Sequence, residues 1–314
     1  MEIIADTTDF FLTRETAVAI GKFDGIHIGH RRLLNEIGAG KKKELSTCVF
    51  TFDPPPSVVF GTGDGRELTT RQEKRVLFER MGVDILIEYP LNKESAAVSP
   101  EFFVRDILAR RMNARLIAAG EDVSFGDKGL GNAKLLESMA KECCFEVKLI
   151  DKVKLEDMEI SSTLVRKQIE LGNMPLAEKL LGMPYTIMGR VEHGKRLGRT
   201  IGMPTINVLP PASKLLPPNG VYYSSVLYNG RRYRSISNVG YKPTVSSERV
   251  LGVESYLYDF HEEIYGAPVE VSLYAFKRPE QKFSGIEELK AQMGRDIAEG
   301  AVWKRAEQNG LEKG

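Results

Sequence analysis

The segment from Thr16 to Ile37 constrains the fold of this chain more than any other part of the sequence. It begins with the short apolar run TAVAIG (16–21), which ends at a glycine and suits a buried parallel strand. It ends with HRRLLNEI (30–37), whose apolar side chains recur at helical spacing. The sequence therefore predicts a strand, a glycine turn and a helix, which together form the first unit of an open α/β sheet.

Four further strand-like runs follow in the first half of the chain and alternate with helical patterns. The runs are TCVFTF (47–52), VDILIEY (83–89), ARLIAAG (114–120) and FEVKLI (145–150). Strands separated by helices predict an open, Rossmann-like parallel sheet that is covered on both faces. Two short helical patterns, STLVRKQIELG and MPLAEKLLG, each close on a glycine and are expected to end a first domain over 1–184.

From residue 185 the pattern changes to strand-length segments that are rich in valine, tyrosine and isoleucine. Glycine, proline and asparagine separate these segments, which predicts an antiparallel β-barrel in a second domain over 185–314. A last amphipathic stretch, residues 285–308, has apolar side chains at helical spacing. We expect it to form a terminal helix that packs on the barrel.

The charge balance narrows the choice of partners, because 44 Lys and Arg face 43 Asp and Glu. A chain with almost no net charge has no global attraction for nucleic acid or anionic lipid, so neither nucleic acid nor a membrane is expected as a partner. Three cysteines provide neither a disulfide framework nor zinc-site spacing and are interpreted as reduced thiols. The chain shows no signal-peptide pattern and no apolar stretch of roughly 20 residues, so the expected location is the cytoplasm.

Two histidines, His27 and His30, lie in the predicted turn between the first strand and the first helix. In open α/β sheets, ligands bind in the crevice beyond the strand ends. The HxGH spacing lets both imidazoles project toward a ligand at the helix N-terminus, and the intervening glycine permits close approach. We expect a phosphate there, because paired imidazole donors stabilise charge that builds up on a phosphoryl group. The alternative is that these histidines cap the helix or lie in solvent.

The string GKFDGIHIGH (21–30) resembles the signature of the HxGH superfamily of nucleotidylyltransferases, which attack the α-phosphate of a nucleoside triphosphate and release pyrophosphate. That superfamily also carries an ISSTxxR element, and ISSTLVR (160–166) matches it at a predicted helix N-terminus. Hydroxyls, helix-end amides and an arginine suit a triphosphate, although SST alone is also a good helix cap. The resemblance implies catalytic roles for His27 and His30. It implies nucleotide binding by Gly21, Phe23, Asp24, Gly25, Gly29, Ser161, Ser162, Thr163 and Arg166.

Two more elements, FDPPP (52–56) and GEDVSFGDKGLGN (120–132), resemble those that distinguish bacterial FAD synthetases from cytidylyl and other adenylyl transferases. FAD synthetases are the flavin-handling branch of the superfamily. The family commonly has histidine where Pro55 stands and an aromatic residue where Val123 stands, so no contact is carried over to these two positions. A mobile surface loop is the alternative for the glycine-rich stretch. The resemblance implies cofactor contacts at Asp122, Phe125 and Gly126.

In the second half, GKRLGRTIGMPTIN (194–207) combines a glycine-rich basic loop with the start of a strand. Glycines let backbone amides face phosphate oxygens, and basic side chains balance the phosphate charge. Thr205 and Asn207 are two residues apart and therefore share one face of the strand. They offer a hydroxyl and an amide carbonyl as hard oxygen ligands for a magnesium–nucleotide complex. Loops of this composition are also common on hairpins that bind nothing.

Taken in order, this loop, LPPNGVY (216–222), NVGYKPT (238–244) and VESYL (253–257) resemble riboflavin kinase. Riboflavin kinase is a small six-stranded barrel that phosphorylates the ribityl end of riboflavin with ATP. The resemblance places the metal at Thr205 and Asn207 and the catalytic base at Glu254, since a carboxylate can take the proton from an attacking hydroxyl. On its local pattern alone, Glu254 is one outward polar residue of an alternating strand. Further nucleotide contacts are implied at Gly194, Lys195, Gly198, Arg199, Gly202, Pro204 and Asn238.

Together the two resemblances cover nearly the whole chain, in the order of the bifunctional prokaryotic riboflavin kinase/FAD synthetase family. They imply riboflavin, FMN and ATP as substrates, Mg²⁺ bound with ATP, and FMN, FAD, ADP and pyrophosphate as products. Three alternatives stay open: a single live active site beside a flavin-binding regulatory domain, a cytidylyl or pantetheine-type transferase with an unrelated barrel, and a non-catalytic flavin sensor or RNA-binding regulator. Weak or transient self-association is also left open.

Overall fold

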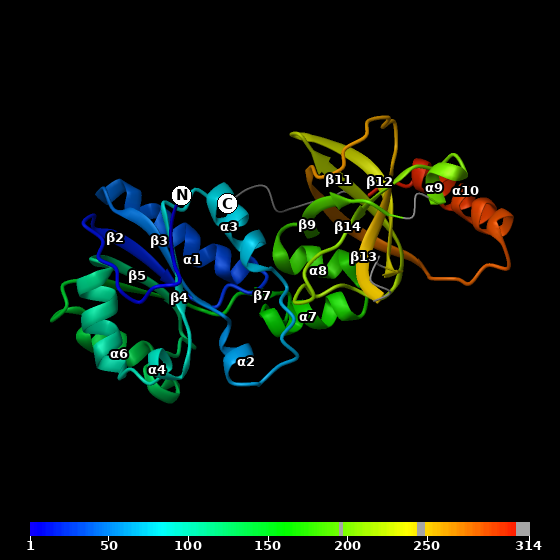
Figure 1. The fold of residues 1–314 in the computed structure, drawn as a ribbon. Coiled ribbons are helices and arrows are strands. Elements are labelled where there is room, and N and C mark those ends of the chain that lie inside the picture. Colours follow the sequence, from blue (N-terminus) through cyan, green and yellow to red (C-terminus); the bar gives the residue numbers. More distant parts are fainter. Residues whose placement is uncertain (195–196, 244–248, 306–314) are drawn as a thin grey trace. The chain divides into compact units, whose positions relative to one another are not determined.

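A computed structural model of the protein describes residues 1–194, 197–243 and 249–305. The chain divides into two compact units, Met1–Val165 and Arg166–Gly314. In Figure 1, the first unit contains the parallel strands drawn in blue to green, and the second contains the barrel drawn in green to orange. The predicted combination of an α/β domain followed by a β-barrel domain is confirmed.

The first unit is built on a six-stranded parallel sheet in the order β1-β4-β3-β2-β5-β6. The strand order reverses at β2, because β3 and β4 lie on one side of it and β5 and β6 on the other. Such a reversal opens a crevice at the carboxyl ends of β2 and β5. The predicted sheet is confirmed, and β1 is a strand that sequence analysis missed. The strands are β1 (Glu2–Ala5), β2 (Thr16–Ile20), β3 (Ser46–Asp53), β4 (Ile85–Pro90), β5 (Ala114–Gly120) and β6 (Glu146–Ile150).

Burial along the central strands shows that both faces of the sheet are covered. Every residue of β2 is buried, as are most residues of β3, β4 and β5. The helices and short segments of this unit are α1 (Ile28–Ala39), η1 (Gly40–Lys43), α2 (Pro56–Val59), α3 (Arg71–Arg80), α4 (Lys93–Ala96), α5 (Pro100–Phe102), η2 (Phe103–Arg111), η3 (Asp127–Gly129) and α6 (Ala133–Ala140). A two-stranded hairpin, β7 (Lys154–Leu155) and β8 (Met158–Glu159), completes the unit.

The second unit contains a closed barrel of six antiparallel strands in the order β10-β13-β12-β11-β14-β9. This confirms the predicted six-stranded barrel. Four buried serines on neighbouring strands, Ser224, Ser235, Ser237 and Ser255, hydrogen-bond to one another at 2.7 Å, which satisfies their hydroxyls inside the fold. The strands are β9 (Tyr185–Glu192), β10 (Thr205–Val208), β11 (Gly220–Tyr228), β12 (Arg231–Pro243), β13 (Arg249–Leu257) and β14 (Pro268–Pro279).

The terminal helix α10 (Ile286–Val302) packs on the barrel, as the sequence predicts. Two barrel side chains bind carbonyl groups in its last turns. Arg234 Nη2 donates to the carbonyl group of Gly300 at 2.7 Å, and Tyr258 Oη donates to a carbonyl group earlier in the helix, also at 2.7 Å. These two side chains donate hydrogen bonds to carbonyl groups near the end of the helix, where the helix itself offers no donor.

Three more helices lie along the chain between the sheet and the barrel, or next to the first barrel strands: α7 (Ser162–Glu170), α8 (Met174–Leu181) and α9 (Leu197–Thr200). The first two correspond to the two helices predicted at the end of the first domain. α7 begins in the first compact unit, and its later residues belong to the second. α8 packs against β9 and β14. The sequence predicts a domain boundary at residue 184, which refers to the residues that each domain needs in order to fold. The division into compact units does not test this, so the boundary stays a prediction.

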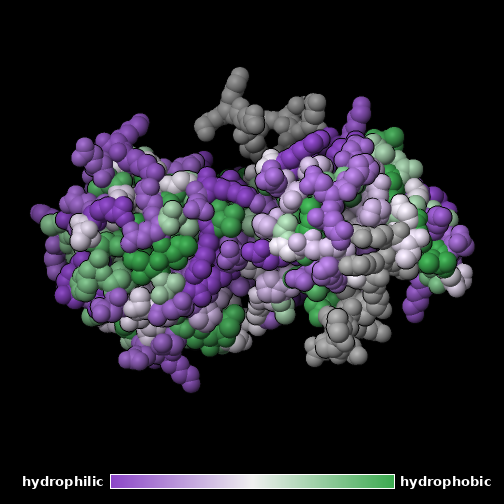
Figure 2. Space-filling model, turned by 45° about the horizontal axis from the view of Figure 1, so that its top comes forward, coloured by the Kyte–Doolittle hydropathy of each residue, from purple (hydrophilic) through white to green (hydrophobic). Residues whose placement is uncertain are grey.

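Several large apolar side chains are exposed among the described residues. Figure 2 shows hydrophilic side chains around smaller hydrophobic areas on the face that is drawn. Two exposed apolar side chains of the first unit lie on and directly after α2: Val58 is 46% exposed and Phe60 is 56% exposed. Among the described residues, the helices include none with the length and apolar character needed to cross a bilayer.

Two candidate active sites

The histidine turn, residues 21–30, lies between the end of β2 and the first turn of α1. Gly21 follows β2 directly, and its N–H donates to a β3 carbonyl group at 3.2 Å. His27 is the N-cap of α1, and its Nδ1 accepts a hydrogen bond from the backbone N–H of His30 at 3.3 Å. The two imidazole rings stack with centroids 3.8 Å apart. Because Nδ1 of His27 is an acceptor, its proton lies on Nε2, which can donate to a ligand.

Both imidazoles of the histidine turn are uncharged at neutral pH. Burial lowers the pKa of His27 to about 4, against weaker opposing effects from a backbone hydrogen bond and from Asp122. Burial, followed by the charges of His27 and Lys74, holds the pKa of His30 well below its usual value. Nδ1 of His30 is buried and has no hydrogen-bond partner among the described residues. Two neutral imidazoles, each with one N–H, can donate to phosphate oxygens.

The backbone of the histidine turn needs its glycines. Gly25 has a φ of 88°, in the left-handed region that favours glycine, and Phe23 has a φ of 50°, which few non-glycine residues adopt. A Cβ on Gly29 would lie 3.1 Å from Nδ1 of His27, so glycine leaves room for this imidazole. Phe23 is fully buried, and its ring lies 5.0 Å from that of His30. Phe23 therefore supports one imidazole from the core, and its predicted contact with the nucleotide stays a prediction.

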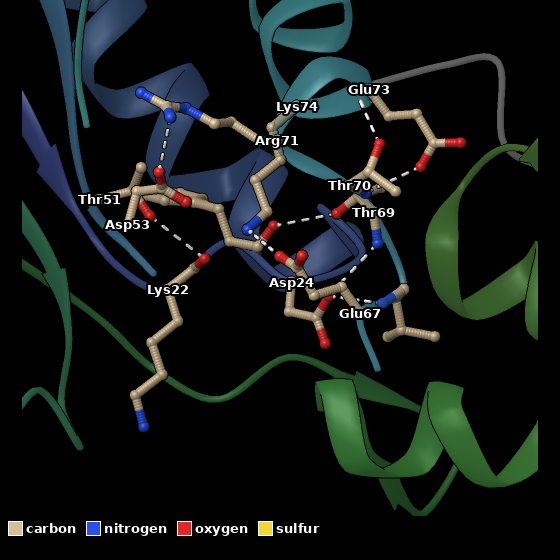
Figure 3. A network of polar contacts seen from close by, with 12 residues as sticks. Lys22, Asp24, Thr51, Asp53, Glu67, Thr69, Thr70, Arg71, Glu73 and Lys74 are labelled. Carbon is tan, nitrogen blue, oxygen red and sulfur yellow. Dashed lines mark hydrogen bonds and ion pairs between the residues drawn. The ribbon is translucent and has the colours of Figure 1, made fainter. Parts of the chain in front are cut away.

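Asp24 joins the histidine turn to residues 67–70, which precede α3 (Figure 3). Its Oδ1 accepts hydrogen bonds from the backbone N–H of Leu68 at 2.7 Å and of Thr69 at 3.3 Å. The Thr69 hydroxyl in turn accepts a backbone N–H of the histidine turn at 2.9 Å. Ser162 Oγ donates to the carbonyl group of Asp24 at 2.7 Å. Asp24 thus fixes the shape of the turn, and its predicted contact with a nucleotide stays a prediction.

Helix α3 places charged side chains next to the histidine turn, and sequence analysis gave none of them a role. Lys74 is buried, and its Nζ lies 3.0 Å from a carboxylate oxygen of Glu67. Thr70 and Glu73 form a capping box that begins the helix. Arg71, the first residue of the helix, contacts three carboxylates. The partners of Lys74 and Arg71 lie outside α3, so the helical pattern alone could not distinguish these two residues from ordinary surface charges.

The glycine-rich stretch after β5 folds into a tight turn that closes on itself. Phe125 and Gly131 form an antiparallel bridge, and the Phe125 side chain is buried. A Cβ on Gly131 would collide with the Phe125 ring, and Gly126 has a φ of 71°. Asp122 lies close enough to His27 to favour its charged form. Asp122 therefore lies near the histidine turn, whereas the predicted cofactor contacts of all three residues stay predictions.

The start of α7 holds the residues of the ISSTxxR element. Ser161 Oγ accepts the backbone N–H of Leu164 at 3.2 Å, which caps the helix. The Ser162 hydroxyl donates to the histidine turn, and Thr163 is exposed. Arg166 lies one helical turn after Ser162 and belongs to the second compact unit. Two of the three hydroxyls therefore hydrogen-bond within the protein, and phosphate binding by this element stays a prediction.

In the barrel, the predicted base and the predicted metal ligands meet on neighbouring strands. Asn207 on β10 pairs with Glu254 on β13 in the antiparallel register, and Thr205 lies two residues before Asn207. Thr205 Oγ1 donates to Glu254 Oε1 at 2.6 Å. Thr205 and Glu254 are 49 residues apart in the sequence, so the fold creates this cluster.

Two glycines of the basic loop pack directly against the predicted metal ligands. A Cβ on Gly194 would collide with the Asn207 amide, and one on Gly198 would lie 3.2 Å from Thr205 Oγ1. Gly202 has a φ of 78°, so glycine also suits the turn that leads into β10. Pro204 is exposed at the start of that strand. Lys195 and the side chain of Arg199, both predicted nucleotide contacts, lie outside the described residues.

Glu280, which follows β14, lies in RPEQKF (278–283), a stretch that also resembles the riboflavin kinase family but to which the sequence assigned no role. Asn238 pairs with Glu254 in the register of β12 and β13, and its Nδ2 donates to Glu280 Oε1 at 3.1 Å. Asn219 Nδ2 donates to the other carboxylate oxygen of Glu280 at 3.3 Å. A Cβ on Gly240 would collide with the same carboxylate. Glu280 thus holds the predicted contact residue Asn238 beside the predicted base.

The donors around Glu254 suit magnesium. A hydroxyl, an amide and a carboxylate are hard oxygen ligands, which Mg²⁺ prefers. The described residues contain no group of three or more His, Cys, Asp or Glu side chains that could hold a metal by themselves. Mg²⁺ commonly keeps several waters and binds substrate phosphates together with one or two protein ligands. The residues therefore fit an ion that arrives with the nucleotide.

Comparisons with known proteins match both halves of the chain. The FAD synthetase family model matches residues 11–164, and the riboflavin kinase family model matches residues 181–303. A bifunctional riboflavin kinase/FMN adenylyltransferase of Listeria monocytogenes is 38% identical over 294 residues, which are 92% of this chain and 93% of that protein. The chain belongs to the bifunctional riboflavin kinase/FMN adenylyltransferase family.

Other relatives of the same bifunctional family match most of the chain, and a solved structure shares its fold. The bifunctional riboflavin kinase/FMN adenylyltransferases of Bacillus subtilis and Escherichia coli are 36% and 37% identical, and the matches cover 91% and 89% of this chain and 91% and 90% of those proteins. The crystal structure of a Streptococcus pneumoniae protein, titled a macrolide-efflux protein, matches with a TM-score of 0.83 at 31% identity. The match covers 96% of this chain and 99% of that one, so the same fold occurs there.

Proposed function

We infer that the chain makes FMN from riboflavin and then FAD from FMN. The barrel unit transfers the γ-phosphoryl group of one ATP to the terminal ribityl hydroxyl of riboflavin, yielding FMN and ADP. The unit with the parallel sheet transfers AMP from a second ATP to FMN, yielding FAD and pyrophosphate. The observation that carries this proposal is the consecutive match of one chain to both enzyme families.

In the adenylyl transfer, an oxygen of the FMN phosphate attacks the α-phosphorus of ATP. The bond from the α-phosphorus to the bridging oxygen breaks, and pyrophosphate leaves. The reaction needs no protein nucleophile, so positioning and electrostatic stabilisation carry it. Nε2 of His27 and the one N–H of neutral His30 donate to the α-phosphate oxygens as charge builds up there. The helix start at Ser161 and Thr163, with Arg166, holds the remaining phosphates.

In the phosphoryl transfer, Glu254 takes the proton of the riboflavin hydroxyl as its oxygen attacks the γ-phosphorus of ATP. The bond from the γ-phosphorus to the bridging oxygen breaks, and ADP leaves with that oxygen. The hydrogen bond from Thr205 fixes one oxygen of the Glu254 carboxylate. Thr205 and Asn207 would hold Mg²⁺, which would balance the charge of the phosphates when bound.

The histidine turn is tested by replacing His27 and His30 together with alanine. We expect FAD formation from FMN to fall by about a hundredfold or more, since each lost donor to a developing charge costs a large factor. FMN formation from riboflavin should stay within about twofold of the wild-type rate, because the proposed base lies in the other unit. Chromatographic separation of flavins after incubation with ATP and Mg²⁺ measures both. An equal loss of both activities would contradict separate sites.

Glu254 is tested by the conservative substitution Glu254→Gln, which keeps the size of the side chain and removes its basicity. FMN formation should fall by about a hundredfold or more, whereas added FMN should still be adenylylated at the wild-type rate. The same chromatographic assay gives both rates. A variant that phosphorylates riboflavin normally would show that another group accepts the proton.

A further inference from the structure

Helix α3 carries two arginines, one turn apart, that share one buried carboxylate. Glu88, at the end of β4, has a side chain that is 3% exposed. Arg71 Nε donates to it at 2.6 Å, and Arg75 donates through Nε at 2.9 Å and Nη2 at 2.5 Å. Burial alone would raise the pKa of Glu88, but the hydrogen bonds from Arg75 and Arg71 outweigh burial and lower it. Glu88 therefore stays ionised and anchors both arginines.

Of the two arginines, only Arg71 also contacts carboxylates other than that of Glu88, and these lie at the carboxyl ends of other strands. Its Nη1 lies 3.0 Å from Asp53 Oδ2, and its Nη2 lies 3.2 Å from Asp6. Asp53 is the last residue of β3 and begins the turn Asp53–Pro56, which leads into α2. Figure 3 shows Arg71 pointing to Asp53 next to the other charged residues of the network. Arg71 therefore ties the first turn of α3 to the start of the Asp53–Pro56 turn.

The Asp53–Pro56 turn borders the histidine turn. Thr51 Oγ1, two residues before Asp53, donates to the carbonyl group of Lys22 at 3.2 Å. The segment that follows this turn presents two exposed apolar side chains, Val58 in α2 and Phe60 directly after it. The molecule that receives AMP must approach the α-phosphate over the histidine turn, and FMN brings a flat apolar ring. Exposed apolar side chains that follow the turn offer the kind of surface that such a ring requires.

We propose that Arg71 is a positioning residue for FMN in the adenylyl transfer, acting through Asp53 to hold the Asp53–Pro56 turn in place. Arg71 itself touches neither ATP nor FMN, and it sets the position of the turn that the flavin contacts. The inference rests on the proposed function, because it concerns the adenylylation of FMN. It predicts an effect on the use of FMN that is separate from the use of ATP.

The helix supplies its own matched control, because Arg75 shares Glu88 with Arg71 and lacks the contact to Asp53. We would compare Arg71→Gln with Arg75→Gln in the full chain. Arg71→Gln should raise the KM for FMN by about fivefold and leave the KM for ATP and kcat within about twofold, a size typical of lost coupling between neighbouring residues. Arg75→Gln should leave all three within about twofold. Far-UV circular dichroism of the same samples reports whether both units are folded.

Asp53→Asn provides a second route that leaves the contacts of Arg71 with Glu88 in place. It should raise the KM for FMN much as Arg71→Gln does, and the double variant should be no worse than the stronger single variant. Additive effects, equal effects of Arg71→Gln and Arg75→Gln, or a matching rise in the KM for ATP would overturn the inference. If the wild-type chain made no FAD from FMN, the proposed function would fail. If it made FAD and Arg71→Gln changed nothing, the inference alone would fail.

Discussion

The neutral state of His27 and His30 at neutral pH is a consequence of the fold, and it cannot be predicted from their spacing in the sequence. HxGH predicts two imidazoles at the start of a helix, and the structure places them there. It does not predict that Nδ1 of His27 is used inside the turn or that both rings are buried. Phe23 packs against the ring of His30, and the charge of Lys74, which lies in another helix, lowers the pKa of His30 further. Both donors are therefore neutral because of packing.

We expect the first unit to lose stability as the pH falls from about 6.5 to about 4. The pKa of His27 is about 4 in the folded protein and has its usual value of 6.5 in the unfolded chain. Between these values the unfolded chain binds a proton that the folded chain does not, so acidification favours unfolding. The loss approaches about 1.4 kcal/mol per pH unit for one such group, and His30 adds to it because its pKa is lowered too.

Urea unfolding followed by far-UV circular dichroism, at about pH 7 and about pH 5, measures this loss. The variant with glutamine at both positions lacks the two titrating groups and should show a shallower dependence on pH. The sequence has one tryptophan, Trp303 in the barrel unit, so its fluorescence follows the other unit as an internal control. Equal losses in wild type and variant would mean that the histidines are not held neutral by the fold.

Arg71, Lys74 and Glu280 show where prediction from sequence ends at the scale of residues. Arg71 and Lys74 fall in the pattern RQEKRVLFER, in which charged residues look like the solvent face of a helix. Their partners come from strand ends and loops, and the partner of Glu280, Asn238, lies 42 residues away. Nothing local marks such contacts. Family motifs name the residues that touch the substrate and omit those that hold these residues in place.

At the scale of elements, hydrophobic periodicity predicts a strand or helix correctly where that element buries a full face. The buried runs of β2 to β5 and the alternating barrel strands β9 and β10 were predicted for this reason. β1 was missed, because it has four residues, none of them fully buried. The glycine-rich stretch after β5 was open to two interpretations, because a turn closed by Phe125 and Gly131 depends on one specific contact. Short elements held by single contacts leave no periodic signal.

The docking of α10 on the barrel gives a test at this scale. Gly300 is buried at the contact, and a Cβ there would collide with Tyr258 Oη and lie 2.6 Å from Ile236 Cδ1. Gly300→Ala should therefore push the last turn of α10 off the barrel and lower the free energy of unfolding by about 1–3 kcal/mol, as overpacking does. Urea unfolding followed by Trp303 fluorescence measures it, because the Trp303 ring stacks on Tyr223 of the barrel at 4.6 Å.

Gly294 in the same helix is the matched control. The nearest atom to a Cβ there is Met203 Cε at 3.6 Å, an ordinary contact distance. Gly294→Ala should raise the free energy of unfolding by up to about 1 kcal/mol, because alanine favours helix over glycine. Opposite signs for the two substitutions would support the docking contact. A stabilising Gly300→Ala would mean that α10 does not press on the barrel at that residue.

At the scale of the whole molecule, the order of the motifs predicted the order of the domains, and the fold keeps the two histidines in one unit and the predicted base of the barrel in the other. The histidine turn belongs to Met1–Val165, and Glu254 with Thr205 belongs to Arg166–Gly314. Two sets of motifs that lie in separate stretches of the sequence, each long enough for a domain, indicate two domains with separate hydrophobic cores. The residue at which one domain ends is less predictable, because α7 and α8 are amphipathic helices that can cover either core.

Separate sites predict that two damaged chains complement each other through FMN in solution. The His27→Ala, His30→Ala double variant should turn riboflavin into FMN, and the Glu254→Gln variant should turn FMN into FAD, yet neither alone should make FAD from riboflavin. Mixed with riboflavin, ATP and Mg²⁺, they should produce FAD after a lag in which FMN accumulates, because FMN must leave one chain and bind the other. The lag should shorten as the concentration of the FAD-forming variant rises. If the mixture stayed without FAD while each variant kept its own activity, FMN would have to pass within one chain, and the two units could not work as independent enzymes.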